Sequence, residues 1–209
     1  MITWQEVDEL IQRAQQPLDD PWLEKLNRDC TPPQPYYRFL YLLAEKLHPP
    51  LALEIGVYTA VASAHLAAGL AAWDGQVIGL DINPVEPAET IKDRYGNYWF
   101  LQADASSTEA IAYTSMLIDR YGALGIVYQD SSHHYYPSLR EWAIYSTFCQ
   151  SDGVWLCDDI LPCFSDPKVD PPGKSMVSYW ETLPEPKRLF PQVLHIGNTM
   201  GLALLDRLT

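Results

Sequence analysis

The chain has 209 residues, of which 47% are hydrophobic and 20% are charged, and its formal net charge is -13. This length suits one globular domain with a small appendage, and such a domain buries a large core without disulfide staples. The negative charge disfavours a duplex nucleic-acid partner, because it repels phosphate backbones, and no apolar run approaches the roughly 20 residues of a membrane span.

The N-terminal part of the chain is acidic and amphipathic, and it lacks the basic and apolar regions of a signal peptide. We therefore expect a cytoplasmic protein. Helices are predicted over 3–15 and 21–28, and a proline-rich break then precedes a stronger helix over 36–47. We interpret residues 1–34 as an N-terminal helical extension and residues 35–209 as the main domain.

Strand-like and helix-like segments alternate through the middle of the chain. Strands are predicted at 51–55, 76–82, 97–104, 124–130 and 153–159. Helices are predicted at 59–73, 107–121 and 138–150. The last of these helices has Ser138 and Glu141 at the spacing of an N-terminal capping box. Because apolar strands that alternate with helices form a parallel sheet covered on both faces, we expect an α/β fold.

The end of the chain departs from this alternation. Two strand candidates, 190–197 and 199–207, are separated by a very short turn, so they should pair antiparallel. The predicted fold is therefore a doubly wound, mostly parallel seven-stranded sheet with an antiparallel edge strand. Residues 161–174 contain four prolines and leave the carboxyl end of the fifth strand, where ligands bind in open α/β sheets. This loop is either a substrate-side flap or a rigid surface loop.

The turn after the first strand contains a single glycine, Gly56, which lets backbone approach a ligand at the start of the next helix. The pattern G-x-G-x-x-G is absent, and this counts against a nicotinamide, flavin or nucleotide-sugar enzyme. Glu54 lies near the end of a strand that should be buried, so its carboxylate needs a partner or a ligand.

Acidic residues also end the second and third strands. Asp81 stands where doubly wound sheets place an acid that bonds a ribose diol, although a turn cap is the competing interpretation. Asp104 stands where an adenine edge would lie, and it is equally well suited to be the N-cap of the following helix.

The fourth and fifth strands end in three more acids, Asp130, Asp158 and Asp159. Adjacent strand ends bring carboxylates together, and clustered carboxylates repel unless a proton or a cation bridges them. All-oxygen ligands favour Mg²⁺, Ca²⁺ or Mn²⁺ over zinc. The alternative is that one acid of the 158–159 pair faces away and caps the next loop.

Two adjacent histidines follow Asp130. His133 lies three residues beyond it, so a neutral imidazole there could accept a proton as a general base. An ordinary polar loop is the competing interpretation. We assign no role to His134.

Taken in order, the segments LEIG, GLDINP, LQADA, IVYQDSSHHY and VWLCDD resemble the class I S-adenosylmethionine-dependent methyltransferases over roughly residues 35–209. The pattern is most similar to the small-molecule O-methyltransferases that include cephalosporin-hydroxylase-like proteins and macrolide-sugar O-methyltransferases. In that subgroup a D-x-x-H segment follows the fourth strand and an acidic pair ends the fifth. Here those residues are Asp130, His133, Asp158 and Asp159.

The resemblance implies transfer of a methyl group from S-adenosylmethionine to a hydroxyl of a small molecule. The positions that it places against the cofactor are Glu54, Gly56, Tyr58, Asp81, Ile82, Asp104, Ala105 and Asp130. It also implies a divalent cation, Mg²⁺ or another, held by Asp130, Asp158 and Asp159. In the subgroup this ion holds two substrate oxygens, and His133 would accept the hydroxyl proton.

Under this interpretation the partner is a small-molecule methyl acceptor, with no nucleic acid and no membrane. The N-terminal helices either pack over the cofactor side or form a homo-oligomer contact. A non-catalytic relative that binds the cofactor and acts as an interaction protein is the alternative, and the single glycine of the first turn favours it.

Overall fold

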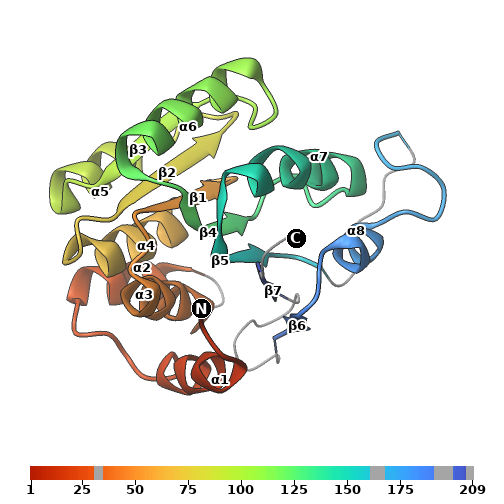
Figure 1. Cartoon of the computed structure of the whole chain (residues 1–209). Coiled ribbons are helices and arrows are strands. Elements are labelled where there is room, and N and C mark those ends of the chain that lie inside the picture. Colours follow the sequence, from red (N-terminus) through yellow and green to blue (C-terminus); the bar gives the residue numbers. More distant parts are fainter. Residues whose placement is uncertain (31–34, 161–167, 191–199, 206–209) are drawn as a thin grey trace.

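The computed structural model describes residues 1–30, 35–160, 168–190 and 200–205. Its core is one seven-stranded sheet with the strand order β3-β2-β1-β4-β5-β7-β6 (Figure 1). The strands are β1 (Leu51–Ile55), β2 (Gln76–Asp81), β3 (Tyr98–Gln102), β4 (Leu124–Gln129), β5 (Cys149–Cys157), β6 (Lys187–Leu189) and β7 (Gly201–Leu204).

The first five strands are parallel to one another, whereas β7 is antiparallel to both β5 and β6. From β1 the sheet grows outward through β2 to β3, and the chain then returns to place β4 on the other side of β1. This reversal between β1 and β4 is a topological switch point, where the loops on the carboxyl side of the strands diverge and leave a crevice. The predicted doubly wound sheet with an antiparallel edge is confirmed.

Helices cover both faces of the sheet (Figure 1). They are α1 (Trp4–Arg13), α2 (Pro21–Asp29), α3 (Pro35–Leu47), α4 (Val61–Ala71), α5 (Pro87–Tyr95), α6 (Thr108–Tyr121), α7 (Tyr135–Tyr145) and α8 (Met176–Thr182). Helices α1 to α5 contribute to one buried apolar cluster, and α6, α7 and α8 contribute to the other. Side chains alternate between these clusters along each strand, because successive strand residues point to opposite faces.

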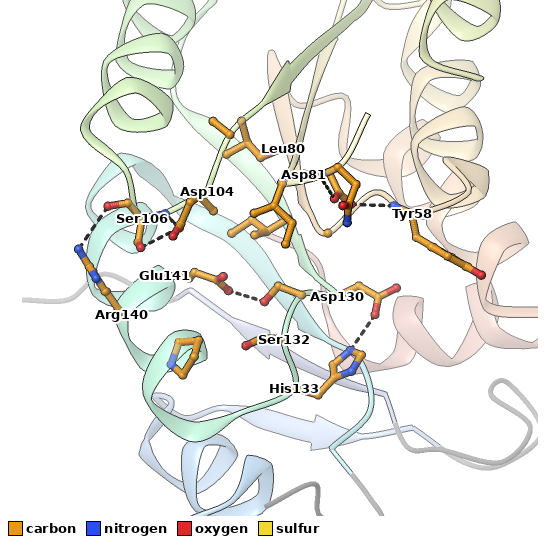
Figure 2. Close-up of a pocket in the computed structure, with 18 of the residues that line it drawn as sticks. Tyr58, Leu80, Asp81, Asp104, Ser106, Asp130, Ser132, His133, Arg140 and Glu141 are labelled. Atoms are coloured by element: carbon orange, nitrogen blue, oxygen red, sulfur yellow. Dashed lines mark hydrogen bonds and ion pairs between the residues drawn. The ribbon is translucent and has the colours of Figure 1, made fainter. Parts of the chain in front are cut away.

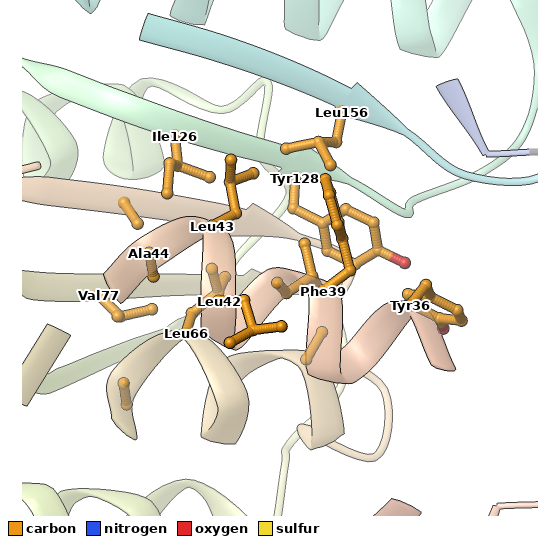
Figure 3. Packing of buried hydrophobic residues seen from close by; sticks show 14 of the residues in the cluster. Tyr36, Phe39, Leu42, Leu43, Ala44, Leu66, Val77, Ile126, Tyr128 and Leu156 are labelled. Carbon is orange, nitrogen blue, oxygen red and sulfur yellow. The ribbon is translucent and has the colours of Figure 1, made fainter. Parts of the chain in front are cut away.

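The α3–α4 face shows how this packing supports the strand ends. Phe39 and Leu43 of α3 pack with Ile126 and Leu156 of the central strands, and all four side chains are fully buried (Figure 3). Tyr128 lies in the same layer, with its ring in the core and its hydroxyl toward the end of β4. The apolar layer therefore carries one polar group up to the carboxyl edge of the sheet.

The N-terminal helices belong to this same core. Val7 and Leu10 of α1 and Leu23 of α2 are buried in the cluster that contains α3 and α4. Arg38 of α3 donates to Glu24 of α2 at 2.6 Å, in an ion pair that is largely buried. The described residues of α1 and α2 do not line the pocket described below. The predicted domain division and homo-oligomer contact stay predictions.

The structure differs from the predicted elements in three places. Helix α5 was not predicted, because only Ala88 and Ile91 of this polar segment are buried. Helix α7 begins at Tyr135, so Ser138 lies inside it and the predicted capping box is wrong. The penultimate strand, β6, precedes the predicted 190–197, most of which lies outside the described residues.

The short helix that follows the proline-rich loop, α8, buries Tyr179 and Trp180 in the second cluster. Of the loop itself, residues 161–167 lie outside the described residues. In the part of the chain that is described, the helices are too short or too polar to cross a membrane. The cytoplasmic location stays a prediction.

Candidate active site

A pocket of about 780 Å³ lies at the carboxyl ends of β1, β2, β3 and β4 (Figure 2). Its position at the reversal of strand order is where open α/β sheets bind ligands. Its lining includes nearly every cofactor-contacting position that the sequence predicted: Gly56, Tyr58, Asp81, Ile82, Asp104, Ala105 and Asp130. His133, the predicted base, also lines it. With Val169 from a fifth segment, residues of five separate chain segments are brought to one concave surface.

Asp81 organises the turn between β1 and α4. One carboxylate oxygen accepts from the backbone N–H groups of Val57 at 2.8 Å and Tyr58 at 2.9 Å, and the other accepts from Asn83 N–H at 2.8 Å. A carboxylate has about four lone-pair sites, so these bonds leave one for a ligand hydroxyl. Asp81 therefore serves the turn-cap role and lines the pocket as well.

The same turn is unusual in its backbone. Gly56, Tyr58 and Ala60 have φ values of 87°, 46° and 59°, in the left-handed region that disfavours side chains other than that of glycine. The hydrogen bonds to Asp81 and the start of α4 stabilise the turn and so offset the strain at Tyr58 and Ala60. The Tyr58 side chain, 85% exposed, stands at the mouth of the pocket. Strained residues of this kind cluster at ligand-binding sites.

Asp104 does not cap the next helix. Its carboxylate accepts from the N–H of Ser106 at 2.7 Å and from the hydroxyl of the same residue at 2.8 Å, whereas Ser107 is the N-cap of α6. The carbonyl of Ala105 accepts from the buried hydroxyl of Tyr145 at 2.5 Å. Of the two interpretations of Asp104, the N-cap is wrong, and the adenine contact stays a prediction.

Glu54 lies outside the pocket. It is 1% exposed, and its carboxyl group forms a short hydrogen bond with the hydroxyl of Ser63 in α4. The hydroxyl of Ser63 lies 2.9 Å from that of Tyr98, which extends the buried polar chain to β3. Burial raises the pKa of Glu54 well above its usual range, and the bond to Ser63 offsets only part of this. The partner of the Glu54 carboxyl group is therefore the hydroxyl of Ser63 and not a ligand in the pocket.

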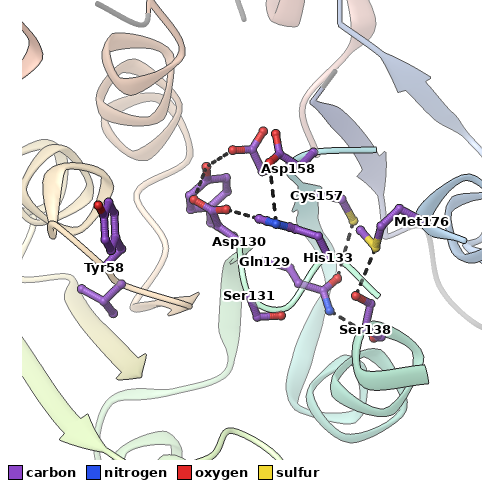
Figure 4. A network of polar contacts seen from close by, with 12 residues as sticks. Tyr58, Gln129, Asp130, Ser131, His133, Ser138, Cys157, Asp158 and Met176 are labelled. Atoms are coloured by element: carbon purple, nitrogen blue, oxygen red, sulfur yellow. Dashed lines mark hydrogen bonds and ion pairs between the residues drawn. The ribbon is translucent and has the colours of Figure 1, made fainter. Parts of the chain in front are cut away.

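The acids at the ends of β4 and β5 meet around two other side chains (Figure 4). The Tyr128 hydroxyl lies 3.2 Å from Asp130 Oδ2 and 3.1 Å from Asp158 Oδ2. Since a phenol carries one proton, it donates to one carboxylate at a time. His133 Nε2 lies 2.9 Å from Asp130 Oδ1, and its Nδ1 lies 3.6 Å from Asp159 Oδ2. The structure thus brings the three predicted acids into one cluster.

The electrostatics of this cluster follow from burial and like charge. Burial, and after it the carboxylate of Asp158, raise the pKa of Asp130 to about 7, although the hydrogen bond from His133 opposes both. Burial alone would lower the pKa of the His133 imidazole, but Asp130 and Asp159 raise it above its usual value. A proton or a cation among these groups is therefore stabilised.

The donor atoms of the cluster have the chemistry of a site for a hard divalent cation, because three carboxylates supply oxygen ligands. Within the described ranges, however, no three His, Cys, Asp or Glu side chains are grouped as a metal site. His133 lies between two of the three carboxylates. An imidazolium in this position supplies part of the positive charge that such a cluster requires.

Sequence reasoning missed a second polar network under the pocket floor. Gln129 donates from Nε2 to Ser138 O at 3.1 Å and to Glu141 Oε2 at 2.6 Å. Its Oε1 accepts from Tyr179 OH at 2.6 Å and from Trp155 Nε1 at 3.2 Å. The signal that could have revealed it is a glutamine at the end of an otherwise apolar strand, since a buried amide needs several partners.

Glu141, which the sequence suggested as a capping residue, is a buried acid on the pocket wall. Its Oε2 also accepts from Ser131 Oγ at 2.7 Å, and burial raises its pKa despite these hydrogen bonds. Arg140, one residue earlier, lines the pocket and donates to Ser106 O at 3.4 Å. Helix α7 therefore supplies a wall of the pocket, which no single sequence motif indicated.

A comparison with protein-family models gives no match to this sequence, and a comparison with curated protein sequences gives none either. Solved structures do match. An O-methyltransferase from Bacillus cereus, in complex with SAH, has a TM-score of 0.62 at 17% identity, over 97% of this chain and 90% of that chain. The O-methyltransferase TomG from Streptomyces achromogenes, involved in tomaymycin synthesis and in complex with SAM, has a TM-score of 0.62 at 18% identity, over 91% and 92% of the two chains.

A third match is MycE, a methyltransferase from the mycinamycin biosynthetic pathway in complex with Mg, SAH and mycinamycin VI. Its TM-score is 0.52 at 16% identity, over 75% of this chain but 45% of that longer chain. At identities this low, the structural matches establish a shared fold and nothing beyond it. The chain has the methyltransferase fold, with the pocket at the strand ends where that fold reverses its strand order.

Proposed function

We propose that this protein binds S-adenosylmethionine in the pocket at the carboxyl ends of β1 to β4 and transfers its methyl group to a hydroxyl of a small molecule. The observation that carries the proposal is the convergence of Gly56, Asp81, Asp104 and Asp130 on one pocket. They come from four different strand ends, and the solved structures with the same fold include O-methyltransferases bound to SAH or SAM.

The pocket chemistry suits this ligand. The last free lone-pair site of Asp81 can accept from a ribose hydroxyl. Ile82, which is 67% exposed, and Ala105 offer apolar surface for a flat base. The negative charge of Asp130 favours a sulfonium cation and an ammonium group nearby. These roles belong to the proposal and rest on the lining of the pocket.

The residues around Asp130 suit the proton transfer. When the hydroxyl oxygen bonds to the methyl carbon, the carbon–sulfur bond breaks, the thioether leaves neutral and the hydroxyl proton must go to a base. His133 bonds Asp130 through Nε2, and its Nδ1 faces Asp159 Oδ2 at 3.6 Å, so a neutral imidazole in this position would accept the proton at Nδ1. Asp130 and Asp159 then stabilise the imidazolium. Positioning of the oxygen in line with the methyl supplies much of the remaining acceleration.

Metal assistance is a further part of the proposal. Asp130, Asp158 and Asp159 would hold Mg²⁺ or a similar cation, and such an ion would lower the pKa of the acceptor hydroxyl and orient it. MycE is described with Mg, and this supports the proposal for a related fold. If the rate of methyl transfer is unchanged in excess chelator, the metal takes no part in the reaction.

The proposed function is tested first by ligand binding. S-adenosylhomocysteine should raise Tm, because a ligand that binds only the folded state stabilises it by mass action. An unchanged Tm at millimolar S-adenosylhomocysteine would contradict the cofactor assignment. Transfer is then measured with labelled S-adenosylmethionine against a panel of small hydroxyl compounds. His133→Ala should abolish transfer and leave S-adenosylhomocysteine affinity within about twofold, because the imidazole acts on the acceptor proton.

One observation favours the non-catalytic alternative. Tyr58 and Ala60 stand in left-handed positions of the turn where glycine would adopt the conformation without strain. An interaction protein would bind S-adenosylhomocysteine with the same stabilisation but show no turnover with any hydroxyl panel. It would also show no effect of His133→Ala on the binding of its partner.

A further inference from the structure

The first turn of α7 is capped by a residue from a distant segment. The N-cap of this helix, His134, makes no capping bond with its own side chain. Instead the backbone N–H of Tyr135 donates to Asp170 Oδ1 at 2.7 Å. Asp170 is 36 residues away from His134 in sequence and lies in the segment before α8. A carboxylate at a helix N-terminus satisfies an orphan N–H and interacts favourably with the helix dipole.

His134 completes this contact. Its Nδ1 lies 2.9 Å from Asp170 Oδ2, and because a carboxylate only accepts, the proton of this bond is on the imidazole. The side chain of Asp170 is 0% exposed, so both of its oxygens are committed inside the protein. Asp170 therefore holds the backbone of one α7 residue and the side chain of its neighbour.

Other contacts join the same two segments. The ammonium of Lys174 lies 5.1 Å from the ring centroid of Tyr135, and Ser138 Oγ donates to Met176 Sδ at 3.3 Å (Figure 4). Helices α7 and α8 lie side by side at this end of the sheet (Figure 1). Of these contacts, the one through Asp170 is buried and charged, so its loss leaves an unsatisfied N–H and a released imidazole.

The contact between Asp170 and the start of α7 lies beside residues that line the pocket. Tyr136 and Pro137, directly after the capped residue, line the pocket, and so do Arg140 and Glu141 one turn further on. Val169, directly before Asp170, lines the same pocket from the other segment. One carboxylate thus ties together two walls of the pocket that are far apart in sequence.

We infer that Asp170 is a positioning residue: by capping α7 and pairing with His134, it sets the distance between the α7 wall and Val169 and so the fit of the pocket to its ligand. This inference rests on the proposed function for the identity of the probe, S-adenosylhomocysteine. It also gives the second histidine of the Asp130–Tyr136 segment a role, which sequence reasoning did not find.

Calorimetric titration of S-adenosylhomocysteine tests the inference, at a temperature where every variant is fully folded. Asp170→Ala should raise Kd at least fivefold. Asp170→Asn should stay within about twofold of wild type, because its carbonyl can accept from Tyr135 N–H while its amide donates to the other tautomer of His134. Rescue by this uncharged isostere identifies the hydrogen bonds as the positioning element.

Asp20→Ala is the matched control. Asp20 also caps a helix with its carboxylate, accepting from Trp22 N–H at 2.8 Å and Leu23 N–H at 3.2 Å, but none of the residues described for α2 lines the pocket. This variant should lose stability without any change in Kd. Equal Kd values for Asp170→Ala and wild type, or an equal rise in Asp20→Ala, would overturn the inference, because the cap would then be structural only.

Native-state hydrogen exchange separates this inference from the proposed function. In Asp170→Ala the backbone amides of Tyr135, Tyr136 and Ser138 should exchange at least tenfold faster than in wild type, with no such change in Asp20→Ala. If wild type fails to bind S-adenosylhomocysteine but this exchange result holds, the proposed function is wrong and the anchoring of α7 by Asp170 stands. Unchanged exchange at these three amides overturns the inference whatever the ligand result.

Discussion

Gly56 provides the sharpest test of how the fold builds the pocket. Its φ is 87°, and a Cβ added there would lie 2.0 Å from the carbonyl oxygen of Asp130 and 2.8 Å from Cα of Ser131. Ordinary non-bonded contacts of carbon are roughly 3.5 Å, so the backbone at Asp130 must move by more than about 1 Å. That backbone is held by the bond from Asp130 N–H to Ile55 O at 2.8 Å.

We therefore predict that Gly56→Ala destabilises the protein by about 3 kcal/mol. The left-handed conformation costs about 1 kcal/mol for alanine, and forcing packed backbone apart costs about 2 kcal/mol more. For a chain of this length the loss corresponds to a fall in Tm of roughly 6–12 °C. Because the displaced residue is Asp130, the affinity for S-adenosylhomocysteine should fall as well.

Gly96→Ala is the control that separates the two contributions. Gly96 also has a positive φ, 75°, but a Cβ there meets nothing within 4 Å. It should lose only the conformational contribution, about 1 kcal/mol. Urea unfolding followed by tryptophan fluorescence measures both variants, with equal m values as the check on two-state behaviour. Equal losses for the two substitutions would refute the reasoning, since the close approach to Asp130 would then cost nothing.

Three further predictions concern buried polar groups. Gln129→Leu should cost at least about 3 kcal/mol in urea unfolding, because it leaves several buried donors and acceptors unsatisfied; a loss below 1 kcal/mol contradicts this. Arg38→Met should cost about 3–5 kcal/mol, and adding Glu24→Gln should restore most of it, because the single change strands a buried carboxylate; an additive double variant argues against the pair. Burial lowers the pKa of His65 to about 4, so the unfolded chain binds the extra proton and stability falls as pH drops from about 6.5 to 4, by about 3 kcal/mol. The free energy of unfolding is measured against pH for wild type and for His65→Phe, because their difference cancels the opposite contribution of carboxyl groups with raised pKa. Parallel curves for the two proteins would contradict the prediction.

The sheet could be predicted because its strands are continuous apolar runs. Strands β1 and β2 are buried on both faces, so their sequences are mostly hydrophobic, and Glu54 is the buried exception in β1. Helix α5 was missed for the converse reason, since it rests on the sheet through two apolar residues, Ala88 and Ile91. Its amphipathic pattern is too sparse to distinguish a helix from a polar loop.

The site was predictable only where its residues stand at strand ends. Asp81, Asp104 and Asp130 each follow an apolar run, and parallel strands bring their carboxyl ends to one edge. Glu54 has the same signal, yet its side chain faces α4, because adjacent strand residues point to opposite faces. The direction in which a residue points at the last position of a strand depends on the register with its neighbours.

The sequence by itself determined the class of fold, the edge of the sheet that binds ligands, and the acids that gather there, because all three follow from local hydrophobic patterning. Only the tertiary structure decided which groups those acids contact. The Tyr128 hydroxyl between Asp130 and Asp158, and the carboxylate of Asp170 at the start of α7, are contacts across 2 to 36 residues of sequence. Hydrogen bonds of this kind depend on side chains meeting in space at about 3 Å, and no spacing along the chain specifies that meeting.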